Sequence, residues 1–376
     1  MKKIPKFLKK DVVLWGALLL AVLSSFVILP DSEYIGYIDF RTLAILFGLM
    51  AVMAGLQKIG FFRRVAEKLL ERIHGEKQLI ALLLLLCFGF GMFITNDVAL
   101  ITFVPFTFTV LSLTGEERKN RLMVPVVVMQ TLAANMGSML TPIGNPQNLY
   151  LYGKSGISLG AFLLLMLPYT LCALVLLLGW CVLRRDGSKE RITISFREQT
   201  SLKGKRKQLI GYFVLFLINL LAVSRILPWQ AAFVLTLAGV ALLDYRVLRD
   251  VDYALLLTFV GFFVFIGNMG RVEGFRSLLQ GVVTGHETVV AIAASQCISN
   301  VPAALLLSGF TKDYGALIVG TNLGGLGTLI ASMASLISYK YIAREEPARK
   351  GNYFVYFTVV NVCFLVVMLV LNRCLN

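Results

Sequence analysis

The sequence predicts an all-α polytopic membrane protein built from inverted repeats, with about nine full spans, two re-entrant hairpins and two broken spans. Three observations predict this fold. Hydrophobic residues make up 57% of the 376 residues and charged residues only 15%, and the mean hydropathy is +0.78. Apolar runs of membrane-crossing length recur along the whole chain. Polar residues interrupt these runs at matching places in the two halves. A water-soluble protein could not cover so much apolar surface, so we expect the chain to lie in a lipid bilayer.

The formal net charge of +15 would suit a nucleic-acid-binding protein, but the positions of the basic residues indicate membrane orientation instead. Twenty-nine of the 36 Lys and Arg residues lie at 1–11, 58–78, 115–121, 184–207, 246–249 and 340–350. Positively charged loops stay in the cytoplasm. The sequence therefore predicts a multi-pass protein of the cytoplasmic (inner) membrane, with a cytoplasmic N-terminus, an external C-terminus and no nucleic-acid partner.

The first elements are two spans, 12–30 and 39–57, joined by an acidic outer stretch. The N-terminus resembles a signal peptide, but its apolar stretch is long and no small-x-small cleavage site follows. We therefore expect a retained first span. Residues 58–77 interleave apolar side chains with Arg63, Arg64 and other basic residues, which predicts an amphipathic helix on the inner membrane surface.

The apolar stretch 79–113 has a basic loop at each end, so it must cross the membrane an even number of times. Its 35 residues are tight for two full spans and a turn, and the polar sequence ITND stands in its middle. We therefore predict a hairpin that enters from the cytoplasm and turns inside the bilayer.

The remaining elements alternate in direction so that every basic loop lies on the inner side. We predict spans at 122–152, 159–183, 209–227, 229–245, 251–270, 314–340 and 352–372, a short amphipathic segment at 271–286 and a second hairpin at 288–311. The second hairpin is broken by SNVPA and bounded by outer loops, so it should enter from the face opposite to the first.

Two parts of the chain resemble each other without a gap: residues 39–63 match residues 252–276. This alignment pairs Asp39 with Asp252, and Lys58 with Arg271. The first copy begins on the outer side and the second on the inner side, so the repeats are inverted. We divide the chain into a first span (1–30), repeat 1 (31–183), a cytoplasmic loop with a connecting span (184–228) and repeat 2 (229–376).

Four polar breaks interrupt predicted membrane helices, one in each hairpin and one in each of the spans 122–152 and 314–340. Non-helical backbone at membrane depth is tolerated only where protein or a water-filled cavity surrounds it. Each break starts a half-helix with free N–H groups and ends another with free carbonyls. Asn96, Asn145 and Asn300 are good N-cap residues. Paired broken helices in inverted repeats predict a binding site near the midplane of the bilayer.

Asp97 is the only acidic residue that we place deep in a predicted membrane segment, and no Lys, Arg or His lies at comparable depth. An intramembrane carboxylate is a candidate cation ligand or proton carrier. The alternative is that it only caps the hairpin helix. His74 and His286 are solitary and no Walker A motif is present, so we predict neither an enzyme nor an ATP-driven pump, and no cofactor other than Na⁺ or H⁺ as the coupling ion.

Four motifs are similar to those of the ion-transporter superfamily: ITNDVALITFVPF, NMGSMLTPIGNPQNLYLY, SNVPAALLLSGFT and NLGGLGTLIAS. The superfamily includes divalent-anion/sodium symporters, citrate transporters, arsenite permeases and one class of sodium–proton antiporters. The motifs look most like its bacterial anion permease branch. The resemblance covers residues 36–372. It implies that the hairpin tips and broken spans bind substrate and coupling cations, and that this part moves as an elevator against a dimeric scaffold.

The resemblance also implies which residues bind substrate and cations. The first cluster is Thr95, Asn96, Asp97, Asn135, Gly137, Ser138, Thr141, Gly144 and Asn145, and the second is Ser299, Asn300, Asn322, Gly324, Gly325, Thr328 and Ser332. The Na⁺ candidates among them are Thr95, Asn96, Asp97 and Asn145 in the first cluster, and Ser299, Asn300 and Ser332 in the second.

Together these patterns predict a secondary active transporter that moves a small inorganic or carboxylate anion, coupled to Na⁺ or H⁺, as a homodimer. Half-helix N-termini, Asn and Thr side chains and a co-bound cation would hold the anion, because no deep Arg or Lys is present. A Na⁺/H⁺ antiporter and an arsenite efflux permease remain alternatives, and an ion channel is the alternative from another class. Saturation of flux and counter-transport in liposomes would separate a carrier from a channel.

Overall fold

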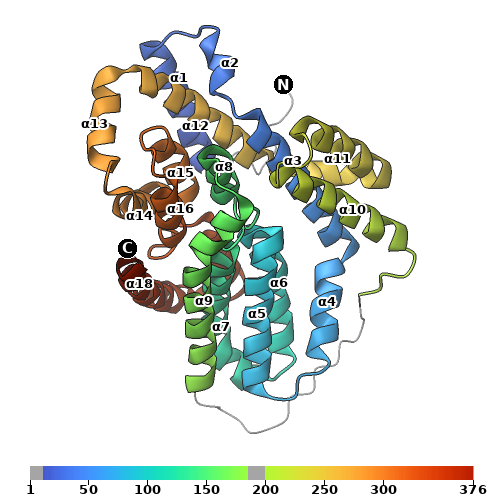
Figure 1. Cartoon of the computed structure of the whole chain (residues 1–376). Coiled ribbons are helices and arrows are strands. Elements are labelled where there is room, and N and C mark those ends of the chain that lie inside the picture. Colours follow the sequence, from blue (N-terminus) through green and yellow to red (C-terminus); the bar gives the residue numbers. More distant parts are fainter. Residues whose placement is uncertain (1–11, 185–199, 376) are drawn as a thin grey trace.

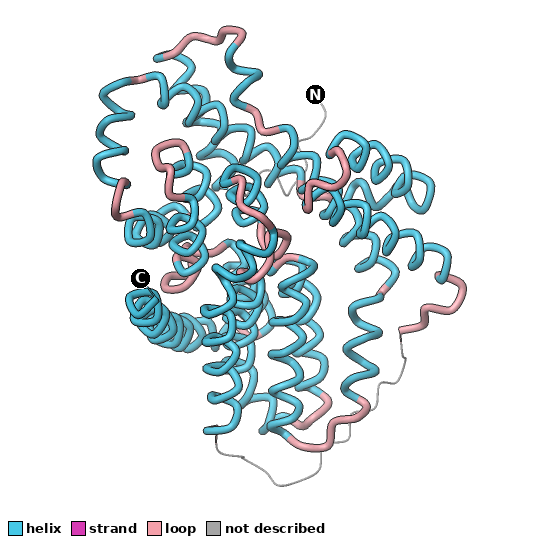
Figure 2. Tube along the Cα trace, viewed as in Figure 1, coloured by secondary structure: helices cyan, strands magenta, loops and turns pink. Residues whose placement is uncertain are grey.

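A computed structural model describes residues 12–184 and 200–375, and every regular element in them is a helix (Figure 1 and Figure 2). In chain order the elements are α1 (Val12–Val27), α2 (Glu33–Tyr37), α3 (Phe40–Ile59), α4 (Phe61–Leu70), α5 (Glu76–Ile94), α6 (Asn96–Ser112), α7 (Glu116–Ser138), α8 (Pro146–Ser155), α9 (Leu159–Leu183), α10 (Arg206–Val223), α11 (Trp229–Asp244), the 3-10 helix η2 (Tyr245–Asp250), α12 (Tyr253–Arg271), α13 (Glu273–Val283), α14 (Glu287–Ile298), α15 (Asn300–Ser308), α16 (Tyr314–Leu323), α17 (Met333–Glu345), the 3-10 helix η3 (Pro347–Arg349) and α18 (Lys350–Leu375).

Within the described ranges, seven helical segments are long and apolar enough to cross a membrane. These segments are α3, α5, α9, α10, α11 with η2, α12, and η3 with α18. The all-α polytopic membrane class predicted from the sequence is therefore confirmed. The broken spans are not among these segments. Each is divided into two helices, α7 with α8 and α16 with α17, and the 23-residue α7 is too polar although it is long enough.

Some element lengths differ from the sequence prediction. The first span was expected over 12–30, but α1 has only 16 residues. In the first hairpin, α5 has 19 residues and extends about 28 Å at 1.5 Å per residue, whereas α14 in the second hairpin has 12 residues and extends about 18 Å. The two hairpins are therefore unequal in length.

The basic segments 115–121 and 340–350 are not loops, as the sequence suggested, but belong mostly to helices. Helix α7 starts at Glu116, with two glutamates in its first turn, where acidic side chains favour the helix N-terminus. Helix α17 continues to Glu345. These helices extend beyond their apolar parts, so the charges indicate where the apolar segment ends and not where the helix ends.

The long helices α3 and α12 begin in the same way. Asp39 accepts a hydrogen bond from the backbone nitrogen of Thr42, and Asp252 accepts one from that of Leu255, both at 3.0 Å. These two N-cap residues are paired in the sequence alignment of the repeats. Each aspartate satisfies a backbone N–H group that the first turn of a helix leaves without an intrahelical partner.

Helices α1 and α11 are exchanged between the two halves. Helix α1 precedes α3 in the chain but packs along α12, whereas α11 precedes α12 but packs along α3. Two ion pairs follow the same pattern: Lys58 Nζ lies 2.8 Å from Asp244, and Arg271 Nη1 lies 2.7 Å from Asp31. The alignment of the repeats that pairs Lys58 with Arg271 also pairs Asp31 with Asp244, so the two ion pairs are equivalent. Each half therefore contributes its first helix to the other.

Helix α10 packs against α3 and α11, and most of the other helices form a second group around the breaks. Helices α5, α6, α7 and α9 lie side by side, and α14, α15 and α16 pack on one another (Figure 1). Helices α4 and α13 connect α3 and α12 to this group. The apolar face of α4, which was expected to lie on the membrane surface, is covered by protein: Phe62, Ala66 and Leu70 are fully buried, and the Phe62 ring packs edge-on against Phe90 of α5.

Candidate functional site

Each hairpin is broken at a single residue, and the two breaks have the same backbone conformation. Thr95 has φ 73° and ψ 148°, and Ser299 has φ 74° and ψ 154°. Among the described residues other than glycine, only Arg225 shares a positive φ. Such conformations cost L-residues about 1–3 kcal/mol each and persist where the surrounding structure enforces them, often at functional sites.

Each hairpin tip is bonded to the broken span of its own half. The backbone nitrogen of Asn96 donates to the carbonyl of Gly144, and that of Asn300 donates to the carbonyl of Ala331, both at 3.0 Å. Two threonines at aligned positions add a second bond: the Thr141 hydroxyl donates to a carbonyl of α5, and the Thr328 hydroxyl to a carbonyl of α14. The same contacts therefore recur in both halves.

A network of buried amides joins the two broken spans. Asn145 Oδ1 accepts from the backbone nitrogen of Asn148 at 2.9 Å and so caps α8, while its Nδ2 donates to Asn322 Oδ1 at 3.1 Å. Asn322 Nδ2 donates in turn to Asn148 Oδ1 at 2.6 Å. The three side chains are at most 4% exposed. Breaking one of these bonds would leave a buried polar group without a partner.

Asn135, the residue aligned with Asn322, has corresponding partners. Its Oδ1 accepts from Asn96 Nδ2 at 3.0 Å and from Ser332 Oγ at 3.2 Å, and its Nδ2 donates to Ser335 Oγ at 3.3 Å. The network therefore connects the first hairpin, both broken spans and the start of α17.

Four helix N-termini meet at one small cavity of about 20 Å³. Its lining comes from the first residues of α6 (Asn96, Asp97), α8 (Pro146, Gln147), α15 (Asn300, Val301) and α17 (Met333, Ala334), together with Ser332, Asp252 and Leu255. A space of this size holds about one water molecule or one monatomic ion. Free N–H groups and the helix dipole make each N-terminus partly positive, which offsets the negative charge of Asp97 and Asp252 in the same lining.

A larger cavity of about 150 Å³ shares Asp97 and Asp252 with the small one. It lies between the first hairpin and α3, and Thr95, Asn145 and Asp250 also line it. Three carboxylates therefore face this space, and its described lining includes no Lys, Arg or His. In contrast to the four N-termini, this lining attracts cations.

The structure brings many of the predicted site residues together. Thr95, Asn96, Asp97, Asn145, Asn300 and Ser332 line one or both cavities, and Asn135, Ser138 and Asn322 lie behind them in the hydrogen-bond network. The Ser299 hydroxyl is buried without a hydrogen-bond partner among the described residues. Thr328 is exposed and lines neither cavity.

The predicted glycines allow backbones to approach each other closely. A Cβ atom on Gly137 would lie 2.1 Å from a carbonyl oxygen of α5, and one on Gly144 would lie 2.0 Å from a carbonyl oxygen of Ser138. Gly324 packs in the same way against Ser295 of α14, and Gly325 against the side chain of Asn300. Gly137, Gly324 and Gly325 thus bring the hairpins close to the broken spans, while Gly144 lets the first break fold back on the end of α7.

Several site residues were missed by the sequence analysis. Asn148 and Ser335 complete the amide network, and their aligned positions in the two halves could have indicated them. Asp252 was not predicted as a site residue, yet it caps α12 and also lines both cavities. Gln296 supports the second break: its Nε2 donates to two carbonyls of that break and its Oε1 accepts from the backbone nitrogen of Thr328. The second break therefore keeps its shape without the prolines of the first.

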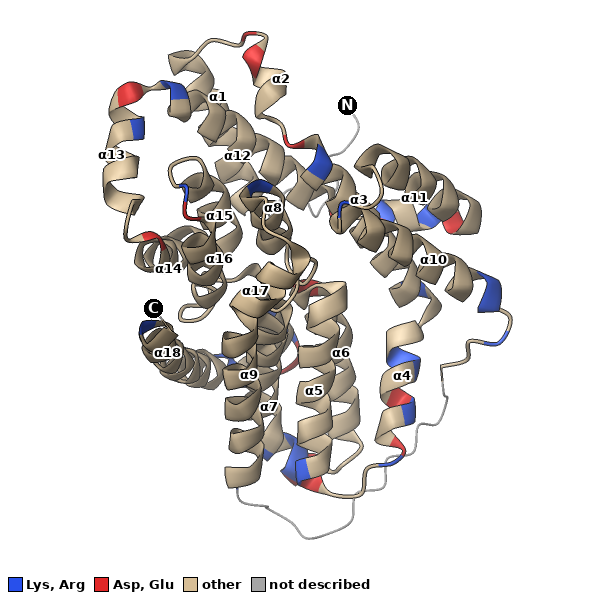
Figure 3. Ribbon diagram, in the orientation of Figure 1, with Lys and Arg blue, Asp and Glu red and all other residues tan. Residues whose placement is uncertain are grey.

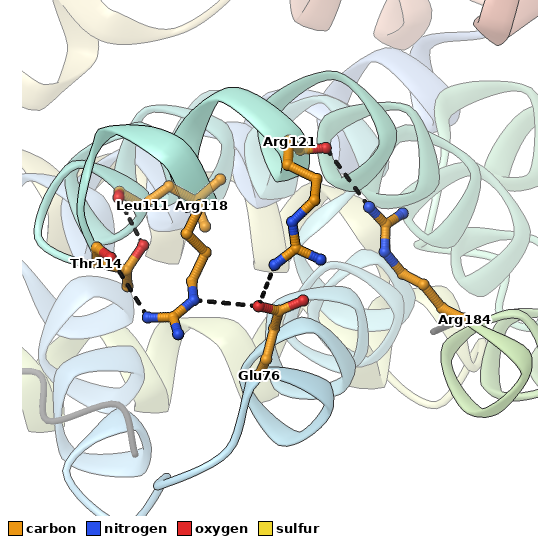
Figure 4. Close-up of polar contacts among 6 residues, drawn as sticks. All are labelled: Glu76, Leu111, Thr114, Arg118, Arg121 and Arg184. Atoms are coloured by element: carbon orange, nitrogen blue, oxygen red, sulfur yellow. Dashed lines mark hydrogen bonds and ion pairs between the residues drawn. The ribbon is translucent and has the colours of Figure 1, made fainter. Parts of the chain in front are cut away.

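The base of the first hairpin is fixed by a buried charge cluster. Glu76, the first residue of α5, accepts from Arg118 Nε at 3.1 Å and from Arg121 Nη2 at 2.6 Å (Figure 4). Both arginines lie in the first turns of α7, and their blue segments lie beside the red start of α5 (Figure 3). The hairpin is thus attached to the broken span at its base as well as at its tip.

Comparison with known proteins gives consistent matches. The family model described as "Citrate transporter" matches residues 7–313. The chain is 33% identical to "Inner membrane protein YbiR" of Escherichia coli (strain K12), over 85% of this chain and 84% of that protein. It is 30% identical to "Uncharacterized transporter MJ0456" of Methanocaldococcus jannaschii, over 91% of each. It is also 36% identical to "Silicon efflux transporter LSI3" of Oryza sativa subsp. japonica, over 42% of this chain and 32% of that protein.

The family match covers most of the chain, and two relatives at 30% identity or more are matched over most of their length. These matches confirm the resemblance to the ion-transporter superfamily. They also agree with a multi-pass membrane protein that is a transporter and not an enzyme. The chain therefore belongs to the citrate transporter family.

Proposed function

We propose that this chain is a secondary active transporter that carries a small inorganic or carboxylate anion across the cytoplasmic membrane, coupled to Na⁺ or H⁺. The observation that carries the proposal is the meeting of four helix N-termini at one cavity. Each N-terminus contributes roughly half a positive charge and free N–H donors. With a co-bound cation to neutralise Asp97 and Asp252 in the same lining, this arrangement supports recognition of an anion without a cationic side chain.

The acidic lining supports the coupling. Asp97, Asp250 and Asp252 face the adjoining cavity and would repel an anion unless a cation lay between them. Anion and cation would then bind better together than apart, which is the condition for cotransport. The proposed ligands of a first Na⁺ are Thr95, Asn96, Asp97 and Asn145. The proposed ligands of a second Na⁺ are Ser299, with its unpartnered hydroxyl, Asn300 and Ser332.

An elevator movement is the proposed mechanism. The hairpins and broken spans are bonded to one another at their tips and across the two halves, so they can move as one body. The group of α1, α3, α10, α11 and α12 would be the stationary scaffold, through which we propose that two copies form a homodimer. In this proposal the hairpins are re-entrant from opposite faces, and α4 and α13 connect the moving and stationary parts.

The test is flux in proteoliposomes with controlled Na⁺ and pH gradients and a panel of small anions. Asp97→Asn should abolish or change the cation dependence of transport while the protein stays folded, because asparagine has nearly the same shape and α6 has its N-cap position at Thr95, not at Asp97. Glu117→Gln, a change of the same charge in the first turn of α7, is the matched control and should behave as wild type. If Asp97→Asn transports with unchanged Na⁺ and pH dependence, the Asp97 carboxylate does not bind the coupling cation and the proposed cation site is wrong. Exchange of Na⁺ for H⁺ without any anion would indicate the antiporter alternative.

A second candidate is efflux of a small neutral hydroxylated solute, such as silicic or arsenious acid. The favouring observation is the match to a protein named a silicon efflux transporter, together with described cavity linings that contain no Lys, Arg or His. Transport of silicic acid that ignores the membrane potential, with no transport of the anion panel, would establish this candidate over the first.

A further inference from the structure

A third cavity, of about 630 Å³, lies at the start of α10. It shares no described lining residue with the two cavities of the proposed transport site. Its charged lining is entirely basic: Arg64 comes from α4, and Lys203 and Arg206 come from the segment that leads into α10. Thr200 and Ser201 add hydroxyl groups. The cavity therefore offers cations and hydroxyls but, among its described lining, no carboxylate.

One nearby carboxylate, that of Glu67, is used to build the cavity. It is fully buried and accepts hydrogen bonds from the Thr200 backbone nitrogen at 2.8 Å and from the Thr200 hydroxyl at 2.9 Å, as well as from Arg63 Nε at 2.9 Å. It lies 3.9 Å from Arg64. These bonds fasten the segment before α10 to α4, which fixes the two walls of the cavity.

Of the three basic side chains in the lining, only Arg64 lies near a described carboxylate, that of Glu67. Lys203 and Arg206 are exposed and form no ion pair with the described residues. The first turn of α10 adds free N–H groups and the positive end of an 18-residue helix. Three basic side chains, the Ser201 hydroxyl and a helix start match the chemistry of a phosphate group.

Next to the cavity, α10 has an exposed apolar face. Ile210, Phe213, Val214, Leu217 and Leu221 of α10 are between 38% and 57% exposed. Their spacing places them on one helix face, and Arg206 begins the same face. Because α10 is long and apolar enough to cross a membrane, this stripe lies against lipid acyl chains, and a lipid whose chain lies there brings its headgroup to the cavity. We infer that the cavity binds the headgroup phosphate of an anionic phospholipid whose acyl chain lies along α10.

The site lies between α4 and α10, so a bound lipid would connect these two helices. Arg64 lies on α4, which leads into the first hairpin, whereas Lys203 and Arg206 lie at the start of α10 (Figure 3). A phosphate bonded to both sides holds α4 against α10. The basic charge of these segments assigns the lipid to the cytoplasmic leaflet.

The inference is tested by native mass spectrometry of the full-length protein, delipidated in detergent and titrated with phosphatidylglycerol or phosphatidylcholine. The wild type should retain phosphatidylglycerol in preference. The double variant Lys203→Gln, Arg206→Gln should bind it roughly thirtyfold more weakly. The matched control is Lys340→Gln, Lys350→Gln, which removes the same charge from exposed positions outside the cavity and should bind as wild type. Equal retention of both lipids by the wild type, or equal loss in both double variants, would overturn the inference.

Two further measurements distinguish a lipid ligand from a soluble phosphate compound. Val214→Asn, on the exposed stripe, should weaken phosphatidylglycerol binding without altering the binding of glycerol 3-phosphate. If millimolar glycerol 3-phosphate or inorganic phosphate displaces the lipid completely and Val214→Asn has no effect, the ligand is a soluble phosphate compound and the lipid assignment is wrong. The melting temperature of each variant in detergent verifies that the compared proteins are folded.

Discussion

Replacing Glu76 with glutamine should destabilise the protein by about 3 kcal/mol. The Glu76 side chain is 2% exposed and bonds two arginines, whose side chains are 11% exposed (Arg118) and 32% exposed (Arg121). Removing one partner of a buried ion pair costs about 3–5 kcal/mol, because the remaining charge is left uncompensated. We expect the lower end of this range, since Arg121 is close enough to the surface to turn toward water.

Glu116→Gln is the matched control for this prediction. It removes the same charge from the neighbouring helix start, but the Glu116 side chain is 75% exposed and lies 3.6 Å from Lys119. Exposed ion pairs contribute about 0–1 kcal/mol. Unfolding of both variants in detergent, followed by helical signal against denaturant concentration, gives the two free energies. A double-mutant cycle with Arg118→Gln should show a coupling of at least about 1 kcal/mol. If Glu76→Gln costs no more than Glu116→Gln, the buried cluster does not fix the base of the hairpin.

Three further predictions follow from the topology, the breaks and the outer ion pair. A cysteine at Lys340 should be protected from an impermeant thiol reagent in intact cells and one at Lys154 should react, and the opposite result would reverse the predicted orientation. Gly144→Ala should lower the free energy of unfolding by about 1–3 kcal/mol, since its Cβ would lie 2.0 Å from a carbonyl oxygen, and an unchanged melting curve would refute that packing. The hydrogen bond from Arg271 lowers the pKa of Asp31 in the folded protein. The stability that this pair contributes is therefore fully present above the ordinary carboxyl pKa, and it is lost as the pH falls through the lower pKa of the folded protein. The difference in melting temperature between wild type and Asp31→Asn should therefore stay constant from about pH 8 to pH 5 and shrink steadily as the pH falls below about 4.

The positions of the breaks could be predicted from the sequence because polar residues are conspicuous inside apolar runs. Helix α6 begins at Asn96, α15 begins at Asn300 and α8 begins at Pro146, directly after Asn145. Asn145 caps α8 and Pro146 follows it, as expected, but Asn96 and Asn300 are the first helical residues and not the N-caps. The N-cap positions are Thr95 and Ser299, and neither side chain makes a capping bond. The match to the citrate transporter family agrees with the class of protein that these breaks indicated.

The contacts between distant elements could not be predicted in the same way. Asp252 lies at the start of α12 after a basic segment, so nothing local shows that it faces the tip of the first hairpin. The bonds of Gln296 are also invisible in the sequence, since a glutamine on a helix next to a break is more often exposed. Hydropathy gives the length of each apolar segment and the basic loops give its direction, but neither shows which helices pack against each other. The exchange of α1 and α11 could therefore not be anticipated.

That exchange has a consequence for how the protein is made. Helix α1 leaves the ribosome early, but its packing partner α12 begins only at Tyr253. At the usual rate of synthesis, the interval between them is roughly 10–50 s. During this time α1 is in the membrane without the helix that will cover it, and the acidic partner of Lys58 has not yet been made. The first half therefore has no complete folded state of its own, and a chain released before α12 would be a substrate for membrane quality control.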